Sequence, residues 1–280
     1  MLNQLNKPLI MGILNITPDS FSDGGKYSDL KAALSHVELM ISEGADIIDI
    51  GGESTRPGSD SVSATEQIHR VIRVIKAIRC QLNYPVLISI DTTSSAVAKA
   101  ALDAGATIIN DVSAGKNDPA LLTLAAQMNA EIILMHSQGT PKTMQDKPYY
   151  KNVMQEVISD LTIQITAALN AGIKKENIAI DPGIGFGKRK QDNLDLLAHL
   201  DTLVALGFPV LLGTSRKRFM GSICSESEPS ELVTATAVTT ALGVMAGVQL
   251  FRVHDVKENR QAANVAWAIK NSQLIETDLV

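Results

Sequence analysis

The sequence is poor in the features that mark secreted, membrane-spanning and zinc-binding proteins. Its two cysteines, Cys80 and Cys224, lie far apart and form no Cys-x-x-Cys pair, which argues against a zinc site and against a disulfide framework. No apolar run approaches the ~20 residues needed to cross a bilayer, and Met1–Pro8 lacks the apolar stretch of a secretory signal. We therefore expect a cytoplasmic protein that does not enter a membrane.

The sequence also lacks an excess of positive charge. It holds 25 Lys and Arg against 30 Asp and Glu, a formal net charge of -5, whereas binding to nucleic-acid backbones demands clustered cations. A small anionic substrate is compatible with this balance if cations converge at one place. The remaining composition, 45% hydrophobic and 20% charged, is typical of a compact globular protein.

Short β-branched runs recur along the chain, and each is followed by a longer helical pattern, the order expected of βαβ units. Eight such runs are present, over residues 9–16, 46–51, 86–91, 107–112, 131–135, 178–181, 210–213 and 249–253. Helical stretches end in glycine, as in SEGAD, LDAGA and LNAGI, which is a C-cap signal. An open doubly wound sheet has the same alternation. The count of eight, and the absence of Gly-x-Gly-x-x-Gly after the first run, favour an α/β fold of the TIM (β/α)8 barrel type.

The length of 280 residues is near the ~250 of a typical barrel, so we expect a single domain over residues 1–280. In such a barrel the loops after the strands gather at the C-terminal face, where catalytic groups lie. Asn15 ends the first run, and its amide is expected to point into this mouth. The second run leads into GGESTRPG, where Thr55 and Arg56 suit an anion, although an isolated Arg is often only a surface residue.

Acid and amide side chains recur at the same height of the predicted barrel. The third, fourth and sixth runs end in Asp91, in Asn110 with Asp111, and in Asp181. Asp91 could instead cap the helix that follows it. A carboxylate flanked by amides suits a heterocycle with a guanidine-like edge, because Asp accepts two hydrogen bonds while Asn both donates and accepts.

Cations follow the seventh and eighth runs, in GTSRKRF and FRVHD. Phosphate sites in barrels often lie after these two strands, so Ser215, Arg216, Lys217, Arg252 and His254 could converge there. Strand alternation puts Arg252 and His254 on one face, towards the barrel interior. The alternative is a solvated surface position for Lys217 and a structural hydrogen bond for His254.

The segment DPGIGFGK after the sixth run resembles a phosphate loop only superficially. A nucleotide-binding P-loop requires Ser or Thr after its Lys, and Arg189 follows Lys188 here. No group of histidines and cysteines has the spacing of a zinc site. Any divalent metal is therefore expected to be oxygen-bound and linked to substrate, which describes Mg2+.

Taken together, the motifs resemble those of the dihydropteroate synthase family. The matching segments span residues 9–255 and are MGILNITPDSFSDGG, GADIIDIGGESTRPG, ISIDT, INDVS, LMH, DPGIGFGK, TSRKRF and FRVHD. The resemblance implies an enzyme of folate biosynthesis. Such an enzyme joins p-aminobenzoate to (7,8-dihydropterin-6-yl)methyl diphosphate, releasing diphosphate and 7,8-dihydropteroate without a covalent nucleophile. It further implies that sulfonamides, which resemble p-aminobenzoate, inhibit the protein.

The same resemblance implies roles for individual residues. Asn15 resembles the Mg2+ ligand, and the residues around the diphosphate would be Asn15, Thr55, Arg56, Arg252 and His254. The pterin-binding set would be Asp91, Asn110, Met135, Asp181 and Lys217, with Asp181 facing the guanidine-like edge. The p-aminobenzoate site would comprise Phe21, Pro57, Phe186, Ser215 and Lys217. The residues expected to contribute to catalysis are Asp91, Asp181, Lys217 and Arg252.

The stretch over residues 230–248 is rich in small and apolar residues and is most simply a buried barrel helix, although the resemblance suggests a homodimer formed on this side. Two other functions remain as alternatives. A corrinoid-type pterin methyltransferase domain would share the barrel, but it has no need for STRPG, SRK and RVH around a diphosphate. A non-catalytic pterin-binding module would require damaged loops, and both first loops are intact.

Overall fold

Eight parallel strands form the centre of the computed structural model, which describes residues 7–16, 26–53, 62–82, 85–139, 143–144 and 146–277. The strands are β1 (Leu9–Asn15), β2 (Ile47–Gly51), β3 (Leu87–Asp91), β4 (Ile108–Asp111), β5 (Glu131–Met135), β6 (Ile178–Asp181), β7 (Leu211–Leu212) and β8 (Leu250–Val253). Their order is β6-β5-β4-β3-β2-β1-β8-β7, and a parallel bridge between Ile180 and Val210 joins the two ends. The predicted barrel is confirmed, with each strand boundary within one residue of its predicted position.

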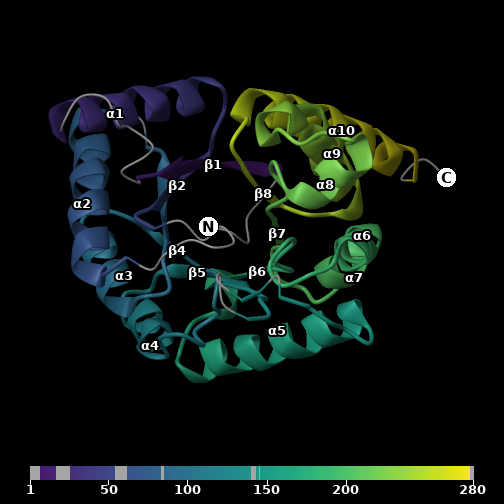
Figure 1. The fold of residues 1–280 in the computed structure, drawn as a ribbon, viewed down its shortest axis with the longest axis horizontal. Coiled ribbons are helices and arrows are strands. Elements are labelled where there is room, and N and C mark those ends of the chain that lie inside the picture. Colours follow the sequence, from purple (N-terminus) through teal and green to yellow (C-terminus); the bar gives the residue numbers. More distant parts are fainter. Residues whose placement is uncertain are drawn as a thin grey trace.

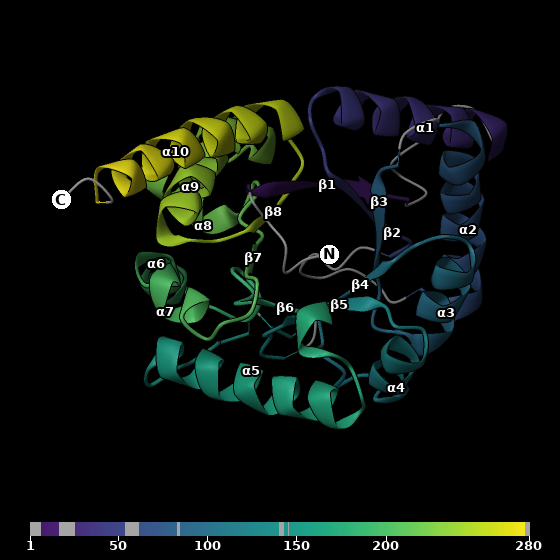
Figure 2. The ribbon, with the colours of Figure 1, turned by 180° about the vertical axis from the view of Figure 1, so that it is seen from behind.

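Helices surround this ring of strands on the outside (Figures 1 and 2). They are α1 (Lys26–Ser42), α2 (Ala64–Gln81), α3 (Ser95–Asp103), α4 (Ala120–Gln127), α5 (Val153–Asn170), α6 (Lys190–Ala198), α7 (Leu200–Val204), α8 (Arg218–Cys224), α9 (Val233–Ala246) and α10 (Val256–Thr277). Two short 3-10 turns, η2 (Lys175–Asn177) and η3 (Pro229–Leu232), precede β6 and α9. Within the described part of the chain, no helix is long and apolar enough to span a bilayer.

The glycines that were predicted to end helices do lie at helix ends. Gly44, Gly105 and Gly172 follow α1, α3 and α5, with φ of 101°, 115° and 96°. A side chain is strained in this left-handed region, whereas glycine is not. These three glycines therefore let the chain leave each helix and turn back towards the next strand.

The helix predicted over residues 230–248 differs from expectation in two respects. Its first turn is the 3-10 turn η3, and only the following residues form α9. It is also not wholly buried, because Val238 and Leu242 are 53% and 61% exposed. These two residues are one helical turn apart, so one face of α9 is apolar and open.

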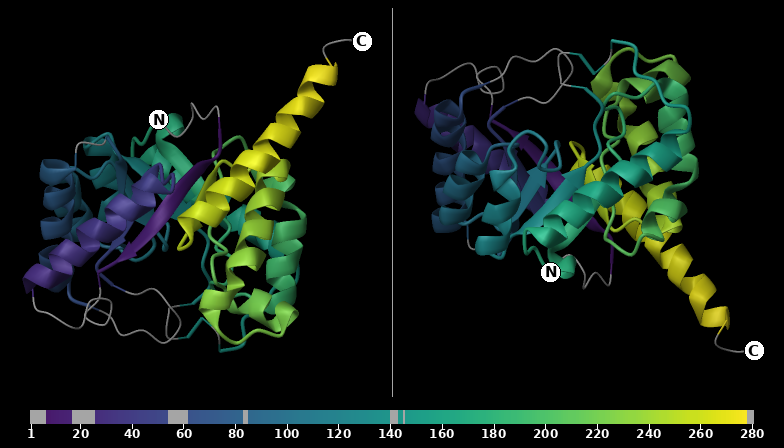
Figure 3. Two further views of the ribbon diagram at one scale, coloured as in Figure 1. Left: turned by 90° about the horizontal axis from the view of Figure 1, so that it is seen from above. Right: turned by 90° about the horizontal axis from the view of Figure 1, so that it is seen from below.

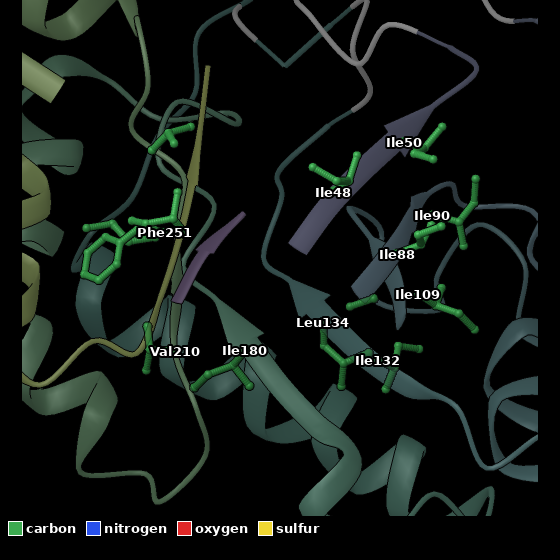
Figure 4. Packing of buried hydrophobic residues seen from close by; sticks show 14 of the residues in the cluster. Ile48, Ile50, Ile88, Ile90, Ile109, Ile132, Leu134, Ile180, Val210 and Phe251 are labelled. Carbon is green, nitrogen blue, oxygen red and sulfur yellow. The ribbon is translucent and has the colours of Figure 1, made fainter. Parts of the chain in front are cut away.

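The hydrophobic core has an outer and an inner part, because alternate residues of each strand point to opposite faces. On the outer face, isoleucines such as Ile48, Ile88 and Ile109 pack beneath the helices (Figure 4). Inside the barrel a separate cluster, here called the apolar floor, consists of Met11, Ile47, Ile108, Ile133, Ala179, Leu211 and Leu250, all fully buried. The floor closes the interior at the N-terminal ends of the strands.

Candidate active site

Above the apolar floor, the inward-facing positions of the strands become polar. Going two residues along a strand leads from Ile47 to Asp49, from Ile108 to Asn110, and from Leu250 to Arg252. Asp91 and Asp181 end β3 and β6 at the same side. We call this set the polar layer: Asp49, Asp91, Asn110, Asp181 and Arg252. Except for the partly exposed Arg252, its members are at most 5% exposed.

Arg252 is the centre of the polar layer. Its Nε donates to Asp49 Oδ2 at 2.6 Å, and its Nη2 donates to Asp91 Oδ2 at 2.7 Å. The amide of Asn110 donates to the same Asp49 oxygen at 3.1 Å. Asp91 is thus bound to a guanidinium rather than capping the next helix, whose N-cap is Ser94.

Sequence reasoning missed Asp49. The signal was a single carboxylate inside the apolar run IIDIG, on the face that two residues later carries Gly51 at the barrel mouth. A fully buried acid in a strand needs a partner, and the chain supplies Arg252 from the other end of the sequence. Asp111, by contrast, was expected among the polar residues of the barrel mouth. Its carboxylate accepts from Ser113 and from the Gly115 N–H, so it holds the loop after β4.

Three polar atoms of this region have no hydrogen-bond partner among the described residues: Asp49 Oδ1, Asp91 Oδ1 and Ser89 Oγ. Each such buried atom costs ~1–3 kcal/mol unless a donor reaches it. Both carboxylates already use their other oxygen for Arg252. The unused acceptors therefore suit a ligand that presents N–H groups.

Burial changes the protonation of the acids. It raises the pKa of Asp91 to about 7, against the opposing attraction of Arg252. It also raises the pKa of Asp181, which Lys217 opposes. The pKa of Arg252 is raised despite its burial, because Asp49 and Asp91 stabilise the cation. The layer thus combines one permanent cation with one acid, Asp91, that exchanges a proton near neutral pH.

Asp181 and Lys217 lie beside this network. A side chain at Gly213 would begin 3.9 Å from Arg252 Cβ and 4.0 Å from Asp181 Oδ2, so these two residues flank the end of β7. Lys217, the N-cap of α8, donates from its ammonium to the Ile184 carbonyl. Burial lowers the pKa of Lys217 to about 8, against the attraction of Asp181. Lys217 is therefore a partly buried group and not a solvated surface lysine.

Of the predicted p-aminobenzoate residues, Phe186 contacts Lys217 and Ser215 contacts His254. The ring of Phe186 lies 4.6 Å from the Lys217 ammonium, close enough for a cation–π contact. Ser215 Oγ lies 2.9 Å from His254 Nδ1 and accepts from the His254 backbone N–H. His254 is thus tied to the loop after β7. Arg216 pairs with Asp255 at 2.5 Å, which engages its charge away from the polar layer.

The remaining predicted positions fall in three groups. Met135 is buried at the end of β5, where its Cγ lies 3.3 Å from the position of a side chain at Gly183. Asn15 lies at the rim, with its Oδ1 3.4 Å from the corresponding position at Gly51. Four predicted residues lie outside the described part of the chain: Phe21, Thr55, Arg56 and Pro57.

Known proteins are similar to this chain in sequence and in fold. A family model described as pterin binding enzyme matches residues 11–254. The dihydropteroate synthase of Streptococcus pyogenes serotype M6 is 51% identical over 91% of this chain and 93% of its own. The structure of Yersinia pestis dihydropteroate synthase with a sulfonamide drug complex aligns with a TM-score of 0.88 and 42% identity, over 95% of each chain.

A second solved structure is similar to this chain in both sequence and fold. Dihydropteroate synthase of Xanthomonas albilineans with 4-aminobenzoic acid aligns with a TM-score of 0.88 and 43% identity, covering 95% of this chain and 94% of that one. Identity at this level over nearly the full length goes well beyond a shared barrel. The chain therefore belongs to the dihydropteroate synthase family of pterin-binding enzymes.

Proposed function

We propose that this protein makes 7,8-dihydropteroate from (7,8-dihydropterin-6-yl)methyl diphosphate and p-aminobenzoate. The amine nitrogen forms a bond to the pterin methylene carbon, the carbon–oxygen bond to diphosphate breaks, and the amine loses a proton. The observation that supports this reaction best is the polar layer, with its two unused carboxylate oxygens beside the partly buried guanidinium of Arg252. We also propose that residues 1–280 form one domain.

The pterin would lie on the polar layer. Asp181 would accept from its guanidine-like edge, while Asp91 and Asn110 would bind the ring nitrogens, and Met135 would line the pocket. A neutral pterin offers N–H donors to acceptors that the folded chain leaves without partners. Asp181 Oδ1 already accepts from Gly183 N at 2.6 Å, which fixes the carboxylate in place.

Catalysis would then consist mainly of charge stabilisation. Departure of diphosphate leaves positive charge on the pterin, and Asp91 and Asp181 would stabilise it. Lys217 and Arg252 would stabilise the negative charge on the other side. Arg252 has five N–H donors and uses two for Asp49 and Asp91, so donors remain for an anion. No side chain needs to act as a nucleophile.

The diphosphate would lie at the rim, among Asn15, Thr55, Arg56, Arg252 and His254. Of the described residues, no group of three His, Cys, Asp or Glu side chains could hold a metal ion. Asn15 offers one neutral oxygen, which fits Mg2+, an ion that keeps several waters and binds substrate phosphates. Bound there, Mg2+ would neutralise charge on the leaving diphosphate.

We further propose that p-aminobenzoate binds next to Lys217, against Phe186 and Ser215, with Phe21 and Pro57 completing the site. A sulfonamide should then compete with p-aminobenzoate and not with the pterin. Initial rates at fixed sulfonamide test this: added p-aminobenzoate should restore the rate. Inhibition that p-aminobenzoate cannot relieve would contradict the assignment.

A homodimer in the cytoplasm is the state we propose for the protein. The support is an apolar surface on α9 and α10, where the exposed fraction of Val238, Leu242 and Met245 is 53%, 61% and 39%, and that of Val265 and Ile269 is 61% and 50%. Figure 3 shows the C-terminal end of α10 projecting beyond its neighbours. Light scattering that finds only monomer at assay concentration would refute the dimer.

A steady-state assay tests the proposed reaction. Purified protein, pterin diphosphate, p-aminobenzoate and Mg2+ should release diphosphate, and omission of p-aminobenzoate should stop the release. If the pterin diphosphate binds but is never turned over, the protein is a non-catalytic pterin-binding module.

A further inference from the structure

The loop between β6 and α6, residues 182–189, folds around a second lysine that the proposed reaction does not use. Lys188 is only 3% exposed. Its ammonium donates to the carbonyls of Gly183 at 2.9 Å and Phe186 at 3.2 Å, and it lies 2.9 Å from His136 Nδ1. These three acceptors match the three N–H groups of a protonated lysine.

The side-chain partner, His136, directly follows β5 and is suited to accept a hydrogen bond. Burial, and after it the charge of Lys188, lowers the pKa of His136 to about 2, so the imidazole is neutral and its Nδ1 can accept a hydrogen bond from the ammonium. Burial also lowers the pKa of Lys188 to about 7, against the attraction of Asp181. The geometry nonetheless requires the protonated form, since a neutral amine has only two N–H groups for three acceptors.

The loop closes tightly around this ammonium. Gly183, Gly185 and Gly187 have φ of 65°, 82° and 62°, a backbone that side chains rarely adopt. A side chain at Gly183 or Gly187 would also clash with the carbonyls of the segment after β5, at His136 and Gln138. The glycines thus allow the loop to lie directly on that segment and to turn successive carbonyls in different directions.

The carbonyls of this loop accept hydrogen bonds from two different lysines. The carbonyls of Gly183 and Phe186 point to Lys188, while the carbonyl of Ile184, between them, accepts from Lys217. The Phe186 ring lies over the same Lys217 ammonium. The loop therefore links a buried lysine with no substrate role to a lysine proposed to contact both substrates.

We propose that Lys188 is a positioning residue: by holding the Gly183 and Phe186 carbonyls, it fixes the Ile184 carbonyl and the Phe186 ring around Lys217. This inference rests on the proposed function, in which Lys217 and Phe186 contact p-aminobenzoate. Lys188 itself touches neither substrate. Its removal should weaken the p-aminobenzoate site more than the pterin site, because Asp91 and Asn110 are held by Asp49 and Arg252 and, in the described part of the chain, make no hydrogen bond to this loop.

The first experiment compares Lys188→Met with Lys190→Met, an exposed lysine two residues away. We expect Lys188→Met to raise the KM for p-aminobenzoate about tenfold or more, as a displaced positioning group does. The Kd for pterin diphosphate should change much less, and Lys190→Met should match the wild type. Unchanged KM in Lys188→Met, or an equal loss of affinity for both substrates, would overturn the proposal.

A second pair of variants covers the case in which Lys188→Met does not fold. His136→Leu removes one acceptor of the ammonium, whereas His136→Gln keeps an acceptor at that place. The KM for p-aminobenzoate should rise in His136→Leu and return towards the wild-type value in His136→Gln. Equal KM values in the two variants would contradict the role of the ammonium.

Amide hydrogen exchange provides a measurement that needs no turnover. In whichever of Lys188→Met and His136→Leu folds, residues 183–187 should exchange faster than in the wild type, while β3 and β4 stay unchanged. Unaltered exchange of residues 183–187 would refute the proposal that Lys188 holds this loop. A wild type that releases no diphosphate would refute the proposed function instead. The exchange measurement does not depend on turnover, so the two failures can be told apart.

Discussion

The apolar floor and the polar layer share the strands β2, β4, β6 and β8, on which their members lie two residues apart, and yet they differ in polarity and in hydrogen bonding. Leu250 is packed against apolar neighbours inside the barrel, whereas Arg252 binds two carboxylates. The floor leaves nothing unsatisfied, while the layer holds buried oxygens that lack donors. Stability is thus concentrated at the N-terminal ends of the strands, and binding capacity is concentrated at the C-terminal ends, where it costs stability.

Substitution in the floor should separate stability from activity. Leu250→Ala leaves a cavity in the closed N-terminal end and should lower the free energy of unfolding by about 2–5 kcal/mol. The folded fraction should retain its kcat/KM, because the polar layer above is intact. Urea denaturation measures the free energy of unfolding, and the diphosphate assay measures kcat/KM. A large loss of kcat/KM in the folded protein would contradict the separate roles of the floor and the layer.

Substitution in the layer should do the reverse. Asp181→Ala removes the acceptor proposed for the guanidine-like edge and should lower kcat/KM by about 10²–10³-fold. Thermal unfolding should not occur at a lower temperature, since the variant relieves a buried charge whose pKa is raised by burial. Asp103→Ala, at an exposed acid paired with Lys99, is the control. Near-normal kcat/KM in Asp181→Ala would remove Asp181 from the site.

The cost of the layer should be visible as a pH dependence. Burial raises the pKa of Asp91 from 3.8 to about 7, so the native protein binds more protons than the unfolded chain between these values. The unfolding free energy contributed by Asp91 then falls as the pH rises through this window, by at most ~1.4 kcal/mol per pH unit.

The variant Asp91→Asn cannot titrate and should escape this decline. Relative to wild type, it should be more stable at about pH 7 than at about pH 5, as measured by urea denaturation at both values. A stability difference that is independent of pH would contradict the raised pKa.

The smallest effect concerns the residue that sequence reasoning missed. Asp49→Asn keeps the shape but removes the charge that binds Arg252, and kcat/KM should fall about tenfold, or ~1.4 kcal/mol. The Kd for pterin diphosphate should rise as well, because Asn110 and Arg252 then share a neutral and weaker acceptor. Asp103→Asn serves as the matched control, and wild-type kinetics in Asp49→Asn would show that Arg252 needs no such support.

The eight strands were predictable because strands covered on both faces are short apolar runs. The mouth residues were predictable as a group, since strand ends point there. The sequence pattern could not predict which of Asn110 and Asp111 faces the interior, because a shift of one residue in register reverses the two faces. Asp49 and Lys188 were missed for a related reason: their partners, Arg252 and His136, are 203 and 52 residues away along the chain.

In the proposed reaction, the polar layer binds a pterin diphosphate and p-aminobenzoate replaces its diphosphate. Product analysis tests this most directly: the wild type is incubated with both substrates and Mg2+, and 7,8-dihydropteroate and diphosphate are quantified together. We predict equal amounts of the two products, and about 10²–10³-fold less dihydropteroate from Asp181→Ala over the same time. Diphosphate release without dihydropteroate, or binding of the pterin with no product, would contradict the account.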